Sequence, residues 1–425
     1  MRKIWKRIGS TLLFVCMLLT MLPTSVFAAN IGMGQIYFGK NSSGFPILWY
    51  MVATDANDNS ITLWTPASMG ARPYDSSTHD SWSGSDICTW LNGTFLNYAF
   101  TSAEQAAIAD YGSTEDPDSI VISQKIVLPS VNEMGTGNSE GVWKIDQNSR
   151  ASADNWWLRT PGASDNVAVY VNSNGEVLVD GDNVSNTHAI CPALKLDVSS
   201  ILFGTAAADG KSRSIGPIAK VVAPSGAMKA TIVDSSITTP SLTLSAESNG
   251  TKAIQFAYSG AQTGANQYLS CALLQSNTLE YYGKLANCAS TSSGEFTFPT
   301  SGVGKGTYEM EIFCEQVNAD SFSDFASAPV GTMTLKVDAE GKGTVSGTGF
   351  SSDDSTPPEL SAGSVNRTGD TTGTIGFTTN EDGAAFYTVM EKDASTPNKN
   401  TVAAGTSIGS VSGTVTNLSV AMNIL

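Results

Sequence analysis

The chain has 425 residues, which exceeds one ordinary domain and predicts roughly three units. Its 39 acidic residues against 23 basic ones give a formal charge of −16, which disfavours nucleic acid and anionic membrane surfaces as partners. Only 15% of the residues are charged, whereas 41% are hydrophobic, so each unit can bury a core. This composition is typical of extracellular modules that are rich in β-structure.

Residues 1–28 have the three parts of a secretory signal peptide. A basic start is followed by an apolar run over residues 12–22 and by the small-residue exit Val26-Phe27-Ala28. The run is shorter than the about 18 to 20 apolar residues that span a membrane. We therefore expect a secreted or cell-wall-associated protein of a Gram-positive-type bacterium, without membrane insertion after the leader is removed.

The first unit, residues 30–203, is predicted to be an α+β domain. Two apolar runs, 45–54 and 60–66, flank a turn rich in Asp and Asn and predict a hairpin. Residues 85–96 carry apolar side chains at helical spacing, and a capping box opens a second helix at Thr101. Another hairpin is predicted to turn at Asn174-Gly175.

The rest of the chain reads as strands separated by Gly, Ser, Thr and Asn. Residues 215–338 contain six or seven short alternating segments, which predict a β-sandwich. Residues 339–358 form a polar stretch that ends in two prolines and predicts a linker. Residues 359–425 offer only about four strands, too few for a closed sandwich, so we expect this last unit to be partial.

Several motifs of the first unit resemble a family of uncharacterised domains from exported proteins of clostridial-type Gram-positive bacteria, domain of unknown function family 6273. The motifs are SDICTWLNGTFLNYAFTSAEQAAI, WWLRTPG, VNSNGEV and ICPALKLDVSSILF. The arrangement also looks like the C-type-lectin and formylglycine-generating fold. No catalytic residue is carried over from this resemblance, so it implies location and architecture more than chemistry.

The later units resemble two kinds of extracellular module. The segment GTYEMEIFCEQVNADSFSDFAS looks like part of a bacterial immunoglobulin-like module, and GTIGFTTNEDGAAFYTVMEKD is similar to fibronectin type III-like modules. In fibronectin type III-like modules two more strands normally follow, so the resemblance implies that this module is truncated here. The resemblance therefore implies β-sandwich spacers behind the first domain.

The cysteines offer candidate disulfides. The first unit contains Cys88 and Cys191, where the resembled family has arginines, and a bond between them would close a loop of about a hundred residues. The alternative is two separate buried thiols. In the second unit three pairings are open among its three cysteines, and Cys271 with Cys314 is one candidate because both lie in the middle of predicted strands.

The sharpest candidate site is a glycan-binding patch. Sugar sites combine aromatic platforms with amide and carboxylate groups, and such side chains occur close together in the first unit. Alternation along the strand predicts that one of the paired tryptophans is buried and the other exposed. The candidate ligand-binding residues are Trp82, Trp156, Trp157, Arg159, Asp180, Asp182 and Asn183.

No cofactor is expected, although calcium at the Asp-rich turn of residues 55–59 is an alternative. A nucleophile pair of Cys191 and His188 is disfavoured, because residues three apart on a strand point to opposite faces. We therefore expect a non-catalytic adhesion or ligand-binding protein whose partner is a glycan or another host or cell-wall surface ligand. The alternatives are an envelope enzyme that acts on glycans and a purely structural stalk.

Overall fold

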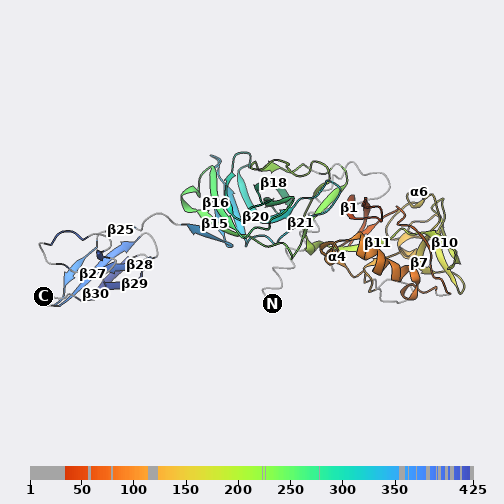
Figure 1. Cartoon of the computed structure of the whole chain (residues 1–425), viewed down its shortest axis with the longest axis horizontal. Helices are drawn as coiled ribbons and strands as arrows, with labels where there is room; N and C mark the ends of the chain where they lie inside the picture. Colours follow the sequence, from red (N-terminus) through yellow and green to blue (C-terminus); the bar gives the residue numbers. More distant parts are fainter. Residues whose placement is uncertain are drawn as a thin grey trace. The chain divides into compact units, whose positions relative to one another are not determined.

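The computed structural model describes most of the chain between Gly34 and Ala421, and Figure 1 shows it as a β-rich molecule. The predicted signal peptide, residues 1–28, lies outside the described residues. The chain divides into two compact units, Met1–Asp353 and Asp354–Leu425, which confirms a multidomain β-rich protein. The described residues are 34–55, 59–77, 80–112, 123–222, 224, 226–276, 278–353, 359–361, 363–369, 371–379, 383–388, 390, 394–397, 401–402, 406–411 and 414–421.

The N-terminal part of the first unit is built on an antiparallel sheet. A hairpin of β2 (Pro46–Asp55) and β3 (Ser60–Trp64) lies where the two apolar runs predicted it. Strand β1 (Gln35–Lys40) pairs with β2, and β11 (Ala193–Asp197) pairs with β3. All five residues of β3 are buried, because β3 lies between two strands and packs into the core on both faces. The short strands β5 (Ile108–Ala109) and β6 (Ile126–Val127) pair with β11.

A second, five-stranded sheet contributes buried side chains to the same apolar core as the first. The predicted turn at Asn174-Gly175 joins two of its strands, and Gly175 has a φ of +80°, which glycine adopts without strain. A Cβ added at Gly175 would lie 1.9 Å from the backbone oxygen of Gln147, so the turn packs tightly against the helical segment that begins at Gln147. In spatial order the strands are β4 (Ala71–Pro73), β10 (Thr187–Ala189), β7 (Trp156–Pro161), β8 (Val167–Val171) and β9 (Val177–Asn183).

The two predicted helices are present. The Ser85 side chain accepts a bond from the Cys88 backbone N–H and opens a helical run that continues to Ala99. The capping box between Thr101 and Glu104 opens α4 (Ser102–Ala107) as its sequence pattern predicts. The helical segments before α4 are η1 (Trp82–Gly84), α2 (Asp86–Trp90), η2 (Leu91–Phe95) and α3 (Leu96–Ala99). Among those after it are α5 (Val131–Met134), α6 (Gln147–Arg150), η3 (Val198–Ser200) and η4 (Ala246–Ser248).

The rest of the first unit is a β-sandwich, whose sheets enclose one apolar core. The first sheet contains β12 (Ile201–Ala206), β13 (Ala219–Lys220), β14 (Met228–Val233), β17 (Gln267–Gln275), β18 (Thr278–Asn287), β20 (Gly306–Gln316), β21 (Asp324–Ala326), β22 (Met333–Val337) and β23 (Gly343–Gly347). The second sheet contains β15 (Ser241–Ser245), β16 (Ala253–Ser259), β19 (Gly294–Pro299) and β24 (Phe350–Asp353).

Two predicted boundaries need correction. Residues 339–358 were expected to be a linker, but β23 pairs with β22 and β24 pairs in parallel with β15. Alternating side chains such as Val345 are buried in the sandwich, which explains why the Gly- and Ser-rich residues 343–353 form strands, whereas residues 354–358 lie outside the described residues. The expected end of the first domain at Phe203 falls inside β12, which pairs with β14 of the sandwich.

The first domain and the sandwich are joined by pairing and by a buried carboxylate. Strand β1 pairs in parallel with β14, so one sheet continues from the domain into the sandwich. Glu104, which is 5% exposed, accepts bonds from the Gly39 backbone N–H at 3.2 Å and from the Ser323 hydroxyl at 2.8 Å. The capping glutamate of α4 therefore also holds the sandwich loop that carries Ser323.

The second unit contains more strands among its described residues than the four or so that were expected. One sheet contains β25 (Leu360–Ser361), β26 (Val365–Arg367), β27 (Thr372–Thr379) and β30 (Thr414–Ala421). Strands β28 (Gly383–Tyr387) and β29 (Thr406–Val411) form a separate antiparallel pair.

The candidate disulfides are absent, since every cysteine in the described part of the chain is an unpaired buried thiol. Cys88 lies 4.0 Å from the Asn92 amide, whereas the Cys191 thiol donates to the Pro66 carbonyl at 3.4 Å. Cys271 lies opposite Ile312, and Cys314 lies opposite Leu269. The last two cysteines are therefore diagonal neighbours, at a spacing of about 7–8 Å that exceeds the usual reach of a disulfide.

Candidate functional site

The three tryptophans expected to form an aromatic platform are buried. Trp82 is 3% exposed, Trp156 is 1% exposed and Trp157 is fully buried, so the prediction that one of the paired tryptophans is exposed is wrong. The reason is that β7 is an inner strand contacted by η1 and α5, which leaves neither of its tryptophans to solvent. The indole N–H groups of Trp156 and Trp157 donate to the carbonyls of Arg150 and Arg72.

The predicted hairpin residues belong to a packed cluster around His188. Asp182 accepts a bond from His188 Nε2 at 2.9 Å, and the imidazole packs on Trp157 with ring centroids 4.2 Å apart. Burial lowers the pKa of His188 below its ordinary value, although the Asp182 carboxylate acts in the opposite direction. Asp180 and Asn183 are exposed on the same hairpin. Trp82, Trp156 and Trp157 are buried, so they offer these two side chains no accessible aromatic surface for a ligand.

Arg159 lies outside the His188 cluster and contacts a different set of residues. Its guanidinium forms a bidentate pair with Glu133, at 2.5 and 3.0 Å, and donates to the Leu128 carbonyl at 2.8 Å. Glu133 also accepts bonds from the Tyr111 hydroxyl at 2.6 Å and from the Ser130 backbone N–H at 2.7 Å. Both oxygens of this carboxylate are therefore occupied, and the pair is rigid.

The Arg159 pair forms the floor of a polar cavity of about 260 Å³, which we call the Arg159 cleft. Strands β2, β3 and β11 form one wall, and the loop after α5 forms the other. The lining residues are Ala53, Thr54, Asp55, Thr62, Tyr111, Gly112, Ser130, Asn132, Glu133, Val142, Trp143, Arg159 and Lys195.

The wall opposite the sheet is built by a chain reversal at Gly141. The backbone N–H groups of Val142 and Trp143 donate to the carbonyls of Asn132 and Glu133, which brings the two segments together. A Cβ at Gly141 would lie 2.4 Å from the Glu133 carbonyl, so a residue without a side chain is required at this approach. The reversal places Trp143 and Asn132 at the same cleft.

A second hollow lies next to the cleft, along this loop. It has a volume of about 620 Å³ and is bordered by Asn132 and Val142, which also line the Arg159 cleft. Val142 is 54% exposed, so an apolar side chain stands at the boundary between the two spaces. The two spaces share these residues and so lie next to each other, and we call them together the groove.

The chemistry of the cleft suits binding better than proton transfer. Burial, together with the Glu133 carboxylate, raises the pKa of Tyr111 well above its ordinary value, so the phenol stays neutral and donates to Glu133. The enzyme alternative requires a pair of carboxylates in a cleft of the first domain, and Asp55 and Glu133 line this one. Because each oxygen of Glu133 already accepts bonds, this carboxylate is poorly placed to transfer a proton to a substrate.

Metal binding has no geometric support in the described ranges. They contain no group of three or more His, Cys, Asp and Glu side chains arranged to hold a metal ion. Of the Asp-rich turn considered for calcium, residues 56–58 lie outside the described residues. The Cys191 thiol is fully buried and contacts the Pro66 carbonyl, while His188 contacts Asp182, so these two side chains are engaged with different partners.

Sequence reasoning found Arg159 but missed its partners. Glu133 belongs to a capping box with Ser130, the same pattern that was recognised at Thr101, so this signal was present in the sequence. Tyr111, Trp143 and Lys195 carry no such local signal, because only the fold brings their separate segments together.

Comparison with known protein families gives a match. Residues 58–198 match the family Domain of unknown function (DUF6273), and this range contains most of the Arg159 cleft. No curated protein and no solved structure matches the chain. Within the described residues, no helix has the length and apolar character needed to cross a membrane.

Proposed function

We propose that this is an exported, non-catalytic protein that binds a glycan of a host or cell-wall surface in the groove of its first domain. The observation that carries the proposal is the Arg159 cleft, which lies next to the second hollow and whose lining combines Trp143, 8% exposed, with hydroxyl, amide and carboxylate groups. Mixed aromatic and polar linings of this kind fit a polyol, which offers both apolar C–H faces and hydroxyl groups.

The remaining units act in this proposal as spacers. The leader over residues 1–28 supports export, and the low charge of the chain supports an extracellular location. The sandwich and the second unit are built from β-sheets, which supports the immunoglobulin-like and fibronectin type III-like assignments. A purely structural stalk would have no use for the groove, which favours recognition.

The test is a glycan array probed with the full chain, with and without calcium. We expect saturable binding that Asn132→Trp abolishes, because Asn132 is exposed and lines both parts of the groove. The matched control is Asn186→Trp, an exposed position beside the predicted hairpin site, which should bind as the natural chain does. Loss of binding in the control alone, or no binding to any glycan, would contradict the proposal.

A further inference from the structure

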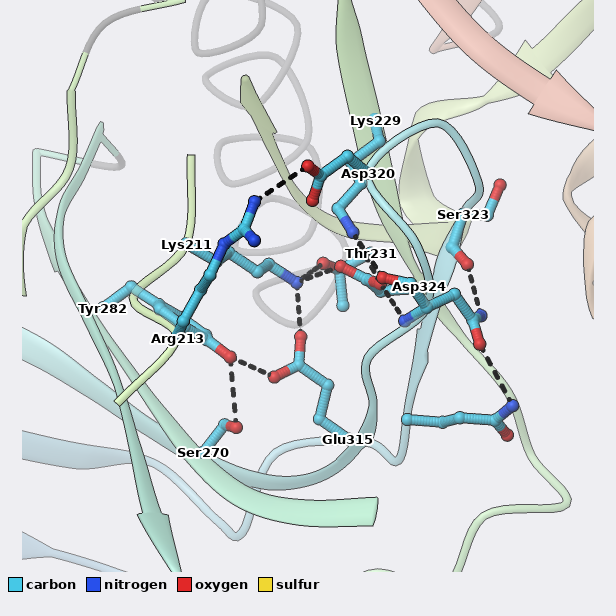
Figure 2. A network of polar contacts seen from close by, with 12 residues as sticks. Lys211, Arg213, Lys229, Thr231, Ser270, Tyr282, Glu315, Asp320, Ser323 and Asp324 are labelled. Carbon is cyan, nitrogen blue, oxygen red and sulfur yellow. Dashed lines mark hydrogen bonds and ion pairs between the residues drawn. The ribbon is translucent and has the colours of Figure 1, made fainter. Parts of the chain in front are cut away.

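A cluster of buried charges lies in the sandwich, at a place that the proposed function does not use. Figure 2 shows Lys211, Lys229, Glu315 and Asp324 pointing toward one another from different segments. Lys211 is 9% exposed and Lys229 is 3% exposed, whereas Glu315 and Asp324 are fully buried. Isolated ion pairs at such depth add little to stability, so the arrangement calls for another explanation.

The contacts place an amine against a carboxyl group. Lys211 Nζ lies 2.7 Å from Asp324 Oδ2 and also contacts Glu315 Oε1. The other oxygen of Asp324, Oδ1, accepts bonds from Lys229 Nζ at 2.9 Å and from the Asn318 backbone N–H at 2.7 Å. Asp324 therefore presents one oxygen to Lys211 and holds the other between two donors.

Lys211 also donates to the Thr231 hydroxyl at 2.6 Å, and two aromatic rings flank its ammonium. Its Nζ lies 4.9 Å from the Phe203 ring and 5.2 Å from the Tyr282 ring. Burial acts to lower the pKa of Lys211, but the carboxylates of Asp324 and Glu315 outweigh it, so the pKa is raised and the resting amine is an ammonium. Proton transfer from the ammonium to a touching carboxylate costs free energy because this pKa is raised, and the removal of two buried charges offsets part of that cost.

We propose that Lys211 and Asp324 form an intramolecular amide bond, with Glu315 as the proton carrier. The Lys211 ammonium passes one proton to Glu315, and the neutral Nζ attacks Cγ of Asp324. The Nζ–Cγ bond forms and the Cγ–Oδ2 bond breaks. Oδ2 leaves as water with the proton carried by Glu315 and a second proton from Nζ, so Glu315 ends unchanged and no oxidant or co-reactant is needed.

Each neighbour has a role in this condensation. The Lys229 ammonium and the Asn318 N–H stabilise the negative charge that develops on Oδ1 during the attack. The Tyr282 hydroxyl donates to Glu315 Oε2 at 2.5 Å, which turns the other oxygen of Glu315 toward Lys211. The fold supplies proximity by holding the amine within contact distance of the carboxyl group.

The bond would close a loop between positions 113 residues apart. It would tie the segment after β12 to β21, and both of these strands pair with β14. Because β14 also pairs with β1, the crosslink would lie next to the strand that joins the sandwich to the first domain. A covalent closure here would limit how far the sandwich extends under tension.

Peptide mapping of the full chain tests the proposal directly. Trypsin does not cleave after an acylated lysine, so the bond predicts a branched product of residues 196–213 joined to residues 306–336, lighter than the sum by one water. Separate peptides with cleavage after Lys211 would overturn the proposal. A branch that starts at Lys229, or that ends at Glu315, would also overturn it, because the reacting pair would be a different one.

A variant tests the proton carrier. Glu315→Gln keeps the shape of the side chain but removes its basic carboxylate, so we expect branched product to form slower by roughly a hundredfold. The control variant Asp320→Asn removes an exposed carboxylate that pairs with Arg213 outside the reacting groups, and it should give the same branched product as the natural chain. An unchanged rate in Glu315→Gln would contradict the role of Glu315.

Discussion

At the scale of single residues, a buried ion pair lines the Arg159 cleft of the first domain. Arg159 is 2% exposed and Glu133 is 7% exposed, and each is the main charged partner of the other. Removing one member leaves the other charge buried without its ion-pair partner, whereas removing both removes the two charges together. We therefore expect the effects of replacing Arg159 and Glu133 on the free energy of unfolding to be coupled.

A double-mutant cycle measures this dependence. We expect Arg159→Met and Glu133→Gln each to lower the unfolding free energy by roughly 3–5 kcal/mol, and the double variant to lose less than their sum by about 1–3 kcal/mol. Urea denaturation supplies the free energies. The matched control is the exposed pair Arg213 and Asp320, 3.0 Å apart, which should show little coupling. Additive losses at Arg159 and Glu133 would count against the buried pair.

A second residue makes stability depend on pH. Burial, with a smaller contribution from Glu309, raises the pKa of Glu311 from its ordinary value of 4.5 to about 8, and its Oε2 has no hydrogen-bond partner among the described residues. As pH rises from 4.5 to 8, the unfolded chain loses this proton and the folded chain keeps it. The folded state therefore binds more protons in this window, and its stability falls as pH rises.

Neutralising this side chain should remove that loss. We expect Glu311→Gln to raise the unfolding free energy by roughly 2 kcal/mol at pH 8 and to have little effect near pH 4.5. Thermal unfolding at the two pH values checks the difference. Glu295→Gln, at an exposed position of β19, is the control and should show no such pH dependence. Equal effects of Glu311→Gln at both pH values would contradict the shifted pKa.

At the scale of elements, glycine is required at the turn between β8 and β9. Gly175→Ala combines an unfavourable positive φ with a contact 1.9 Å from the Gln147 carbonyl, so we expect a loss of roughly 2–4 kcal/mol. Gly44→Ala has a similar φ of +81° with no atom within 4 Å and should cost only about 1 kcal/mol. Denaturation midpoints compare the two variants. Equal losses would mean that packing at Gly175 is unimportant.

Local patterns account for what the sequence predicted well. The hairpin over residues 45–66, the turn at Asn174-Gly175 and the capping box at Thr101 depend on neighbours in the chain, and all three were predicted. The burial of both Trp156 and Trp157 was not predicted. Strand alternation indicates on which face of the sheet a side chain lies, but it does not indicate whether other elements cover that face. The Arg159 cleft also escaped prediction, since its lining comes from segments far apart in sequence.

At the scale of the whole molecule, the continuous sheet predicts that the first domain and the sandwich unfold together. Seven of the eight tryptophans lie between Trp49 and Trp157, so indole fluorescence reports on the first domain. We expect Leu273→Ala, at a fully buried position of the sandwich core, to lower the unfolding temperature seen by this fluorescence. Glu295→Ala on the sandwich surface should leave it unchanged. A fall seen by circular dichroism alone would show that the two parts unfold independently.

The most direct test of the central claim is amide hydrogen exchange of the full chain with and without the best-binding glycan from the array. Binding in the groove predicts slower exchange over residues 130–144, which form the wall shared by the Arg159 cleft and the neighbouring hollow. Exchange over residues 180–188, which carry the hairpin once expected to bind, should not change. Protection confined to that hairpin or to the sandwich would contradict the account.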